Sequence, residues 1–149
     1  MRKNIAVVGC GHWGKNLVRN FYDLGSLRAI CDPDANTAEQ LSKKYSVDNI
    51  SFDQALKDSK IEGVVLAVPA PSHAVMAIAA AEAGKHVYVE KPLALSVSDA
   101  EKIIQAAKQN NVQLMVGHLL QYHPIFSEVS NLVRRGELGT LKYIYSNRL

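Results

Sequence analysis

The sequence predicts an α/β domain of the doubly wound type, in which helices cover both faces of a mostly parallel (Rossmann) sheet. Two observations support this fold class. Short apolar runs alternate with longer amphipathic segments, and such alternation is typical of parallel strands joined by right-handed helical crossovers. The apolar runs are also nearly continuous in Val, Ile and Leu, as expected for strands buried on both faces. With 149 residues, 48% of them hydrophobic, the chain can bury one core.

The apolar runs give the expected strands in order. They are Asn4–Gly9, Leu27–Asp32, a short run near Ile50–Phe52, Gly63–Pro69, His86–Glu90 and Val112–Gly117. The segments between them repeat apolar residues at the spacing of one helix face, which predicts helices over His12–Leu24, Asn36–Tyr45, Asp53–Asp58, Ser72–Ala83 and Ser98–Asn110. Gly25 and Gly84 follow two of these helices, where glycine easily takes the left-handed conformation that ends a helix.

The last part of the chain has a different pattern. Pro124–Gly139 is predicted to be a helix, and Thr140–Leu149 then alternates apolar and polar residues like a strand with two unlike faces. A single strand cannot bury its own face. We therefore expect this strand either to begin a second sheet that the chain mostly lacks or to pair with another molecule.

The segment "VVGCGHWGKN" carries a GxGxxG motif between the first strand and the first helix. Gly9 is expected to make the tight turn, Gly11 to let the backbone approach a pyrophosphate, and Gly14 to let the helix pack close to the strand. The free N–H groups at the start of the helix would bind the phosphates. The alternative is a tight strand-to-helix turn without a ligand, because glycine triplets also occur by chance.

An acidic residue follows the motif by about 20 residues, at the end of the second strand. A carboxylate there, Asp32, would accept both hydroxyls of an adenosine ribose and would repel a 2′-phosphate, which favours NAD over NADP. Asp32 could instead only cap a helix. His12 and Trp13 lie in the glycine turn and are further cofactor-binding candidates, although Trp13 could equally be a core aromatic.

Another strand ends at the same predicted edge. Val68 and Pro69 are the last residues of the predicted strand that begins at Gly63, and ligands of doubly wound sheets lie beyond such ends. We expect both to contact the cofactor. His73, at the start of the next helix, is either a cofactor-binding residue or only a first-turn residue.

The segment "HVYVEKPLALS" places an acid and a base side by side at the end of the fifth strand. A lysine near a cationic nicotinamide in a partly desolvated cleft could have a lowered pKa and act as a general base, with the neighbouring glutamate orienting it. Glu90 and Lys91 are therefore cofactor-binding candidates, and Lys91 is the catalytic candidate. The alternative is a solvated surface pair, and the residues alone do not decide between the two.

Composition and charge exclude several other classes. The net charge of +3 comes without a run of Lys and Arg interleaved with aromatics, which argues against nucleic acid as a partner. We find no signal peptide, membrane span or serine-nucleophile motif, so a cytoplasmic location is expected. The five histidines lack the spacing of metal ligands, so no metal site is expected. Cys10 and Cys31 are expected to be free thiols.

Taken together, these residues resemble the Gfo/Idh/MocA family, the group of glucose–fructose oxidoreductase and inositol dehydrogenase. The matching segments are the glycine motif, the acid at the end of the second strand, "AVPAPSH", "YVEKPLALS" and the "GELG" before the last strand. The resemblance implies NAD(P)-dependent oxidation of a sugar or polyol hydroxyl to a ketone. It implies that Lys91 contacts substrate and nicotinamide, that the Lys91–Pro92 bond is cis, and that the protein forms a homo-oligomer.

The resemblance also implies how the chain is divided. Residues 1–122 would form the NAD-binding domain, and residues 123–149 would form a connecting helix and the first strand of a truncated C-terminal substrate domain. Members of the family are more than twice as long, so this chain is expected to be either a fragment or a natural short form, and a fragment should bind NAD but turn over little or no substrate.

The resemblance extends to a narrower substrate class. "GHLLQYHP" and the closing "YIYSNRL" look most like members that oxidise position 3 of nucleotide-linked, such as UDP-linked, N-acetylamino sugars. By position, His118, Gln121 and Tyr122 would lie near the nicotinamide or the substrate. Two other functions stay open: a non-catalytic dinucleotide-binding module or regulatory subunit, and a domain that binds another ligand such as S-adenosylmethionine.

Overall fold

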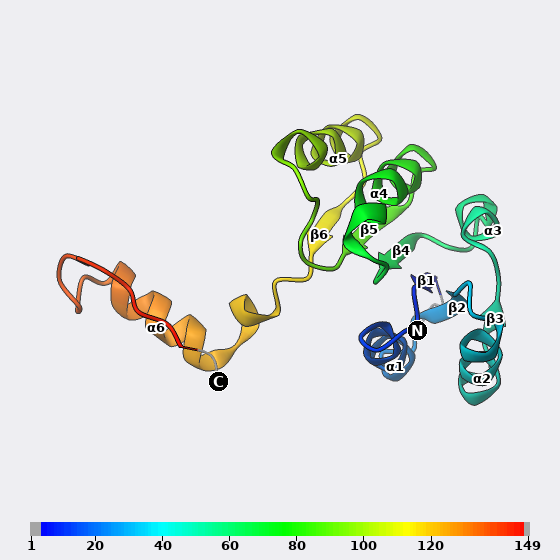
Figure 1. Ribbon diagram of the computed structural model, residues 1–149, viewed down its shortest axis with the longest axis horizontal. Helices are drawn as coiled ribbons and strands as arrows, with labels where there is room; N and C mark the ends of the chain where they lie inside the picture. The colour runs from blue at the N-terminus through cyan, green and yellow to red at the C-terminus, as the bar shows by residue number, and fades with distance from the viewer. Residues whose placement is uncertain (1–3, 148–149) are drawn as a thin grey trace. The chain divides into compact units, whose positions relative to one another are not determined.

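The computed structural model describes residues 4–147, and within them six parallel strands form one sheet (Figure 1). The strands are β1 (Ile5–Val8), β2 (Leu27–Cys31), β3 (Asp48–Asn49), β4 (Gly63–Leu66), β5 (His86–Val89) and β6 (Leu114–Val116). Their order across the sheet is β3-β2-β1-β4-β5-β6, and every neighbouring pair is parallel. This is the doubly wound order, in which the winding reverses between β1 and β4. The predicted fold class is confirmed.

Helices cover both faces of the sheet. They are α1 (Gly14–Asp23), α2 (Ala35–Tyr45), α3 (Phe52–Lys57), α4 (His73–Glu82) and α5 (Val97–Gln109), with a short 3₁₀ turn η1 (Ala70–Ser72) before α4. One buried cluster joins the sheet to α1 and α2, and another joins it to α3, α4 and α5, so the two groups lie on opposite faces (Figure 1). This double coverage explains why the strands are almost wholly apolar.

Side chains cap several helix starts. Asp34 accepts hydrogen bonds from the Asn36 and Thr37 amides at the start of α2. Ser51 and Gln54 form a reciprocal capping box at the start of α3. In contrast, α1 begins without a side-chain cap and without an acidic residue in its first turn. The Lys15 and Asn16 amides bond the carbonyl oxygens of Gly11 and Trp13, so the backbone of the glycine turn, and no side chain, supplies their acceptors.

The capping box explains one difference from the prediction. The third strand was expected near Ile50–Phe52, but β3 is Asp48–Asn49 and Phe52 is already the first residue of α3. Ser51 stops the strand because its side chain accepts from the Gln54 amide and commits the following residues to a helix.

The chain divides into two compact units, Met1–Gly117 and His118–Leu149. The second contains a 3₁₀ turn, η2 (Leu119–Tyr122), and α6 (Pro124–Arg134), which ends just before Gly136, where the backbone takes a positive φ of 73°. The expected domain boundary after residue 122 stays a prediction. Within residues 4–147, no helix is long and apolar enough to cross a membrane.

The strand expected over Thr140–Leu149 does not form in the part that the structure describes, residues 140–147, and residues 148–149 lie outside that part. Tyr143, Ile144 and Tyr145 are exposed there. The reason is the one that the pattern itself suggests, because an isolated strand has no partner for its backbone groups.

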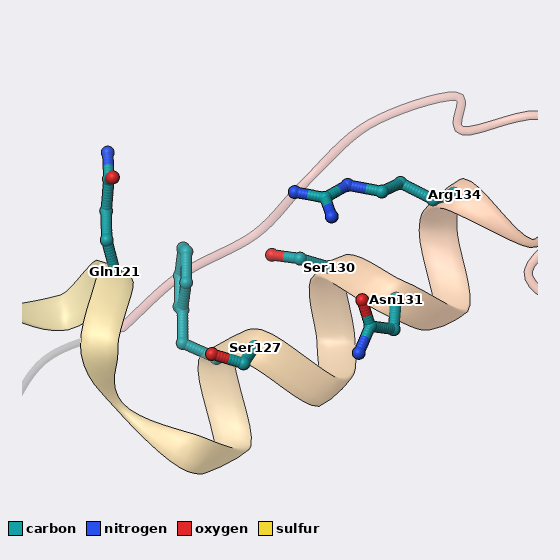
Figure 2. A pocket seen from close by; sticks show the side chains of 6 residues that line it. Gln121, Ser127, Ser130, Asn131 and Arg134 are labelled. Atoms are coloured by element: carbon teal, nitrogen blue, oxygen red, sulfur yellow. The ribbon is translucent and has the colours of Figure 1, made fainter.

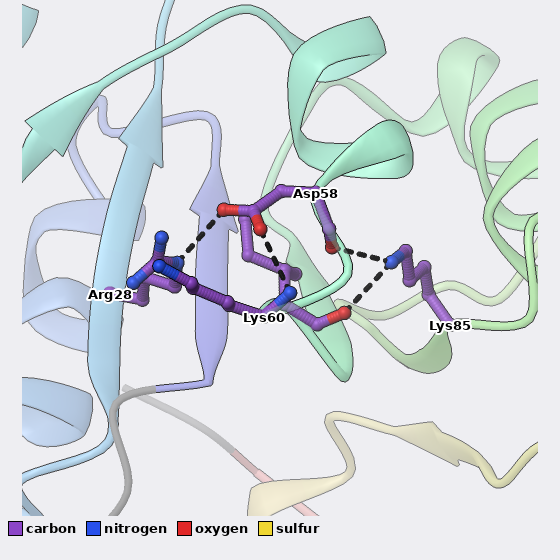
Figure 3. Close-up of polar contacts among 5 residues, drawn as sticks. Arg28, Asp58, Lys60 and Lys85 are labelled. Atoms are coloured by element: carbon purple, nitrogen blue, oxygen red, sulfur yellow. Dashed lines mark hydrogen bonds and ion pairs between the residues drawn. The ribbon is translucent and has the colours of Figure 1, made fainter.

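A buried lysine joins two loops at the amino edge of the sheet (Figure 3). Lys85 is 7% exposed, and its ammonium donates to the carbonyl oxygens of Asp58 and Ile61, both at 2.8 Å. The Asp58 carboxylate in turn accepts from the Lys60 amide at 2.8 Å and from Arg28 Nε at 2.9 Å. These bonds hold the pKa of the Asp58 carboxyl below its ordinary value, the Lys60 amide being the larger cause.

Replacing Lys85 by Met should lower the free energy of unfolding by about 2 kcal/mol, because the variant keeps the apolar stem but leaves the Ile61 carbonyl oxygen without its donor and the Asp58 carbonyl oxygen with the Ile61 amide alone. Lys60→Met is the matched control, since exposed Lys60 bonds Asp58 through its backbone amide, and it should change stability by less than about 0.5 kcal/mol. Urea unfolding followed by circular dichroism measures both. Equal losses in the two variants would contradict this account of Lys85.

Candidate functional site

The predicted site residues of the first unit follow four neighbouring strands at one edge of the sheet. The glycine turn follows β1, Asp32 follows β2, Val68 and Pro69 follow β4 after Ala67, and Glu90 follows β5. Because all strands are parallel, their carboxyl ends share one edge, and the β1/β4 switch point lies in the middle of it.

The three glycines of the turn have different surroundings. Gly9 has a φ of +83°, and a Cβ atom there would lie 2.6 Å from the Ala67 carbonyl oxygen. A Cβ at Gly14 would overlap the carbonyl oxygen of Gly9. These two glycines therefore let the turn and helix α1 pack closely. At Gly11 a Cβ would meet nothing within 4 Å, so this glycine keeps space open beside the backbone.

The start of α1 can accept an anion. The helix begins at Gly14 next to the turn, and neither a capping side chain nor an acidic residue occupies its first turn. The partial positive charge of a helix N-terminus favours phosphate in that position. The open space at Gly11 and the uncapped N-terminus together fit a dinucleotide pyrophosphate.

Asp32 is tied to the glycine turn. Its Oδ2 accepts from the Cys10 amide at 2.6 Å, and its Oδ1 accepts from the Asp34 amide at 2.8 Å. An ionised carboxylate has about four lone-pair positions, so each oxygen can accept one further hydrogen bond. The arrangement fits the predicted contact with two ribose hydroxyls, and the two amide bonds fix the carboxylate for it.

The two cysteines lie under this part of the site as buried free thiols. Burial raises the pKa of Cys31 to about 12. Burial, followed by the charge of Asp32 and the neighbouring Cys31, raises the pKa of Cys10 to about 12 as well. Both are therefore protonated and weakly nucleophilic at neutral pH, so neither has the character of a catalytic thiolate.

The loops after β4 and β5 are joined by His73. Its ring is 1% exposed, with Nδ1 2.7 Å from the carbonyl oxygen of Pro92 and Nε2 2.8 Å from that of Val68. Pro69 is exposed and Val68 is partly buried. Direct contact of these residues with a cofactor stays a prediction, but both ring nitrogens of His73 already face backbone carbonyls.

Glu90 and Lys91 differ in their surroundings. Glu90 is 7% exposed, and its carboxylate accepts from the Tyr88 hydroxyl at 3.0 Å and from the Lys91 amide at 3.3 Å. Lys91 is exposed, and no ion pair joins its ammonium to Glu90 in the described part of the chain. The Lys91–Pro92 peptide bond is cis, as predicted. Glu90 therefore orients the Lys91 backbone rather than its ammonium.

Sequence reasoning missed the partners of Glu90. Tyr88 and Glu90 are two residues apart and so point to the same face of the sheet. Gly117, which follows β6, lies against them, because a Cβ there would come within 2.8 Å of Glu90 Oε1. The two-residue spacing of Tyr88 and Glu90 in a strand was the sequence signal that could have predicted their contact. The position of Gly117 against them depends on the register between β5 and β6, which the sequence alone does not give.

The remaining candidates belong to the second unit. His118, Gln121 and Tyr122 are exposed on or beside η2. Gln121 and one side of α6 border an open hollow of about 310 Å³ (Figure 2). Its other lining residues are Phe126, Ser127, Ser130, Asn131 and Arg134. A role of the three candidates near substrate stays a prediction. Within residues 4–147, no three His, Cys, Asp or Glu side chains are grouped to hold a metal ion.

Comparison with known proteins agrees with this geometry. Residues 3–118 match the model of a family described as an oxidoreductase family with an NAD-binding Rossmann fold. The scyllo-inositol 2-dehydrogenase (NAD(+)) of Bacillus subtilis strain 168 is 32% identical over 142 residues, which cover 90% of this chain and 41% of that protein. The 2,7-anhydro-N-acetylneuraminate hydratase of Escherichia coli strain K12 is 31% identical over 148 residues, covering 97% of this chain and 39% of that protein.

Solved structures show the same fold. The scyllo-inositol dehydrogenase of Lactobacillus casei, solved with NAD(H) and scyllo-inositol, superposes with a TM-score of 0.86 at 25% identity and covers 93% of this chain and 43% of that one. The UDP-N-acetylglucosamine 3-dehydrogenase of Acidithiobacillus ferrooxidans has a TM-score of 0.81 at 24% identity, covering 88% and 43%, which is a likeness of fold. This chain spans less than half the length of each of these relatives.

Variants of Gly11 and Gly14 should separate effects on NAD binding from effects on folding stability. Gly11→Ala should change the free energy of unfolding by less than about 0.5 kcal/mol, because its methyl group enters open space. The same methyl group would fill the space expected for the pyrophosphate and should weaken NAD binding by about tenfold or more.

Gly14→Ala is the matched comparison. Its methyl group overlaps the Gly9 carbonyl, so this variant should lose about 1–3 kcal/mol of stability. Urea unfolding and calorimetric NAD titration measure the two properties. A Gly11→Ala variant that binds NAD as tightly as the parent would contradict the assignment of the pyrophosphate site.

Proposed function

This chain belongs to the Gfo/Idh/MocA oxidoreductase family, and we propose that it is the cofactor domain of an NAD-dependent dehydrogenase that oxidises a hydroxyl of a sugar or polyol to a ketone. The family resemblance drawn from the sequence is confirmed by the match over residues 3–118. The inositol dehydrogenases among its relatives support the polyol or sugar class. Because the relatives are much longer than this chain, the dehydrogenase activity is itself a part of the proposal.

The observation that carries the proposal is the glycine turn. It combines open space at Gly11 with an uncapped α1 N-terminus and a fixed carboxylate at Asp32. These are a phosphate site and a ribose site at one switch point, which is where dinucleotides bind in doubly wound sheets. A tight turn without a ligand would need Gly9 and Gly14, but it would not need the space at Gly11.

Asp32 supports NAD over NADP. Its two oxygens are held by the Cys10 and Asp34 amides and can still accept from two ribose hydroxyls. A 2′-phosphate in the same position would lie at hydrogen-bond distance from the Asp32 carboxylate, which the two amide bonds hold in place. The two negative charges would repel each other, so NADP should bind more weakly than NAD.

Lys91 is the catalytic residue in this proposal. Bound NAD would supply the acceptor for the hydride taken from the substrate carbon. Lys91 would act as the general base: its neutral amine would accept a hydrogen bond from the reacting hydroxyl and take up the hydroxyl proton, a role that requires an amine without an ion-pair partner. Its exposure fits that requirement, as does the absence of an ion pair with Glu90 in the described part of the chain, and Glu90 would steady the backbone through the Lys91 amide.

The narrower substrate class rests on the resemblance of two segments. "GHLLQYHP" and "YIYSNRL" favour oxidation at position 3 of a UDP-linked N-acetylamino sugar, with His118, Gln121 and Tyr122 near the substrate. A second domain would supply further substrate contacts, and assembly into a homo-oligomer is expected with it. The second candidate function is a non-catalytic dinucleotide-binding module or regulatory subunit.

Calorimetric titration with NAD, NADP and S-adenosylmethionine tests the cofactor assignment. NAD should bind more tightly than NADP, and S-adenosylmethionine should not compete. Asp32→Asn should weaken NAD binding by about tenfold and reduce the preference over NADP, because it removes the charge that repels a 2′-phosphate. Asp23→Asn, at the exposed end of α1, is the control. An unchanged preference in Asp32→Asn would refute the role of this carboxylate.

Lys91→Met tests the catalytic assignment. In a form of the protein that reduces NAD with inositols, other polyols or UDP-N-acetylamino sugars, this variant should lower turnover by about 100-fold or more, the usual contribution of a general acid–base group. NAD affinity should fall much less, and Lys60→Met should behave as the parent. NAD binding with no turnover on any of these substrates would favour the non-catalytic module.

A further inference from the structure

His73 connects the two loops that border the proposed nicotinamide side of the site. It is the first residue of α4 and is 1% exposed. One ring nitrogen lies 2.7 Å from the carbonyl oxygen of Pro92, the residue after Lys91, and the other lies 2.8 Å from the carbonyl oxygen of Val68. The ring thus bridges the loop after β5 and the loop after β4.

The loop that carries Lys91 has few other anchors. From Lys91 to Leu95, in the described structure, no backbone amide or carbonyl pairs with another backbone group. The Lys91 amide donates to Glu90, and Leu93 packs with Ala94 against the larger core cluster. The bond from His73 to Pro92 is therefore the polar contact that fixes this loop to an element distant in sequence.

We propose that His73 is a positioning residue of the cofactor site, which sets the place of Lys91 by holding the neighbouring Pro92 carbonyl beside the Val68 loop. The proposal rests on the proposed function, in which Lys91 meets substrate and NAD. It gives His73 a role through the backbone in place of direct cofactor contact.

The protonation of the ring determines how many loops it holds. A carbonyl oxygen only accepts, so each contact is a hydrogen bond when that ring nitrogen carries a hydrogen, and both at once need the imidazolium. A neutral ring holds one carbonyl and releases the other. Positioning of the Lys91 loop therefore depends on a hydrogen at Nδ1, the ring nitrogen that faces the Pro92 carbonyl.

The elements around His73 supply no compensating charge at its ring. Strand β4 and turn η1 contain no ionisable side chain, and His86 lies at the opposite end of β5. The charged residues of α5 and of the end of α4 are at least partly exposed, and Glu90 bonds Tyr88 and the Lys91 amide. These α4 and α5 residues are Glu82, Asp99, Glu101, Lys102 and Lys108. Within residues 4–147, His73 forms no ion pair.

Two amide variants separate the two contacts. In His73→Asn the side-chain nitrogen can reach the position of Nδ1 and so keep the link to Pro92, whereas in His73→Gln it reaches the position of Nε2 and keeps the link to Val68. Hydrogen exchange of the Lys91 and Leu93 amides, followed by NMR without NAD, reports on the loop. Exchange at these amides should be about tenfold faster in the Gln variant than in the Asn variant, the usual effect of one hydrogen bond. Val75→Ala, exposed on the same helix, is the control.

NAD titration of the same variants gives a second readout. The Asn variant should bind NAD about tenfold more tightly than the Gln variant at equal unfolding stability. Equal exchange in the two variants, or equal NAD affinity at equal unfolding stability, would overturn the proposal.

The design also distinguishes this proposal from the proposed function. If the parent chain does not bind NAD, the proposed function fails, while amide exchange measured without NAD still decides whether His73 positions the loop. If a variant does not fold, the NMR signals of the two His73 ring nitrogens in the parent still test the proposal. Nδ1, which faces the Pro92 carbonyl, should carry a hydrogen, and a ring that carries its hydrogen on Nε2 alone would refute the proposal.

Discussion

The close packing of the β1 turn against its two neighbouring strands is the constraint on which the rest of the site depends. The Gly9 amide donates to the Cys31 carbonyl at the end of β2, and its Cα faces the Ala67 carbonyl after β4. A side chain at Gly9 or Gly14 would separate these backbones. Only when they touch can Asp32 reach the Cys10 amide and α1 begin directly beside the turn. Cofactor recognition is therefore a consequence of sheet packing.

Much of this arrangement was predictable because it depends on local sequence. The apolar runs predict the strands and the glycines predict the turns, and both signals depend only on residues close in sequence. Because the strands are parallel, their carboxyl ends then meet at one edge of the sheet. Asp32 could be identified because strand β2 ends one residue before it. The cis bond before Pro92 was predicted from the family resemblance and is confirmed.

The parts that could not be predicted depend on contacts between distant segments. Nothing near His73 in the sequence indicates that its ring meets Pro92, which is 19 residues away. The adjacent positions of Glu90 and Lys91 in the sequence suggested an interaction between their side chains, but the strand geometry directs the Glu90 side chain toward Tyr88. The strand predicted over Thr140–Leu149 does not form in the described residues. The alternation of its apolar and polar residues is a local strand signal, but a strand is stable only when a neighbouring strand pairs with it.

The site divides cofactor binding and chemistry between two kinds of structure. The groups expected to hold NAD are backbone amides, a helix end and one carboxylate, all fixed by the sheet. Lys91 lies on a loop without backbone pairing and is held by side chains of Glu90 and His73. Changes in that loop and in a second domain can alter the reaction without disturbing the sheet.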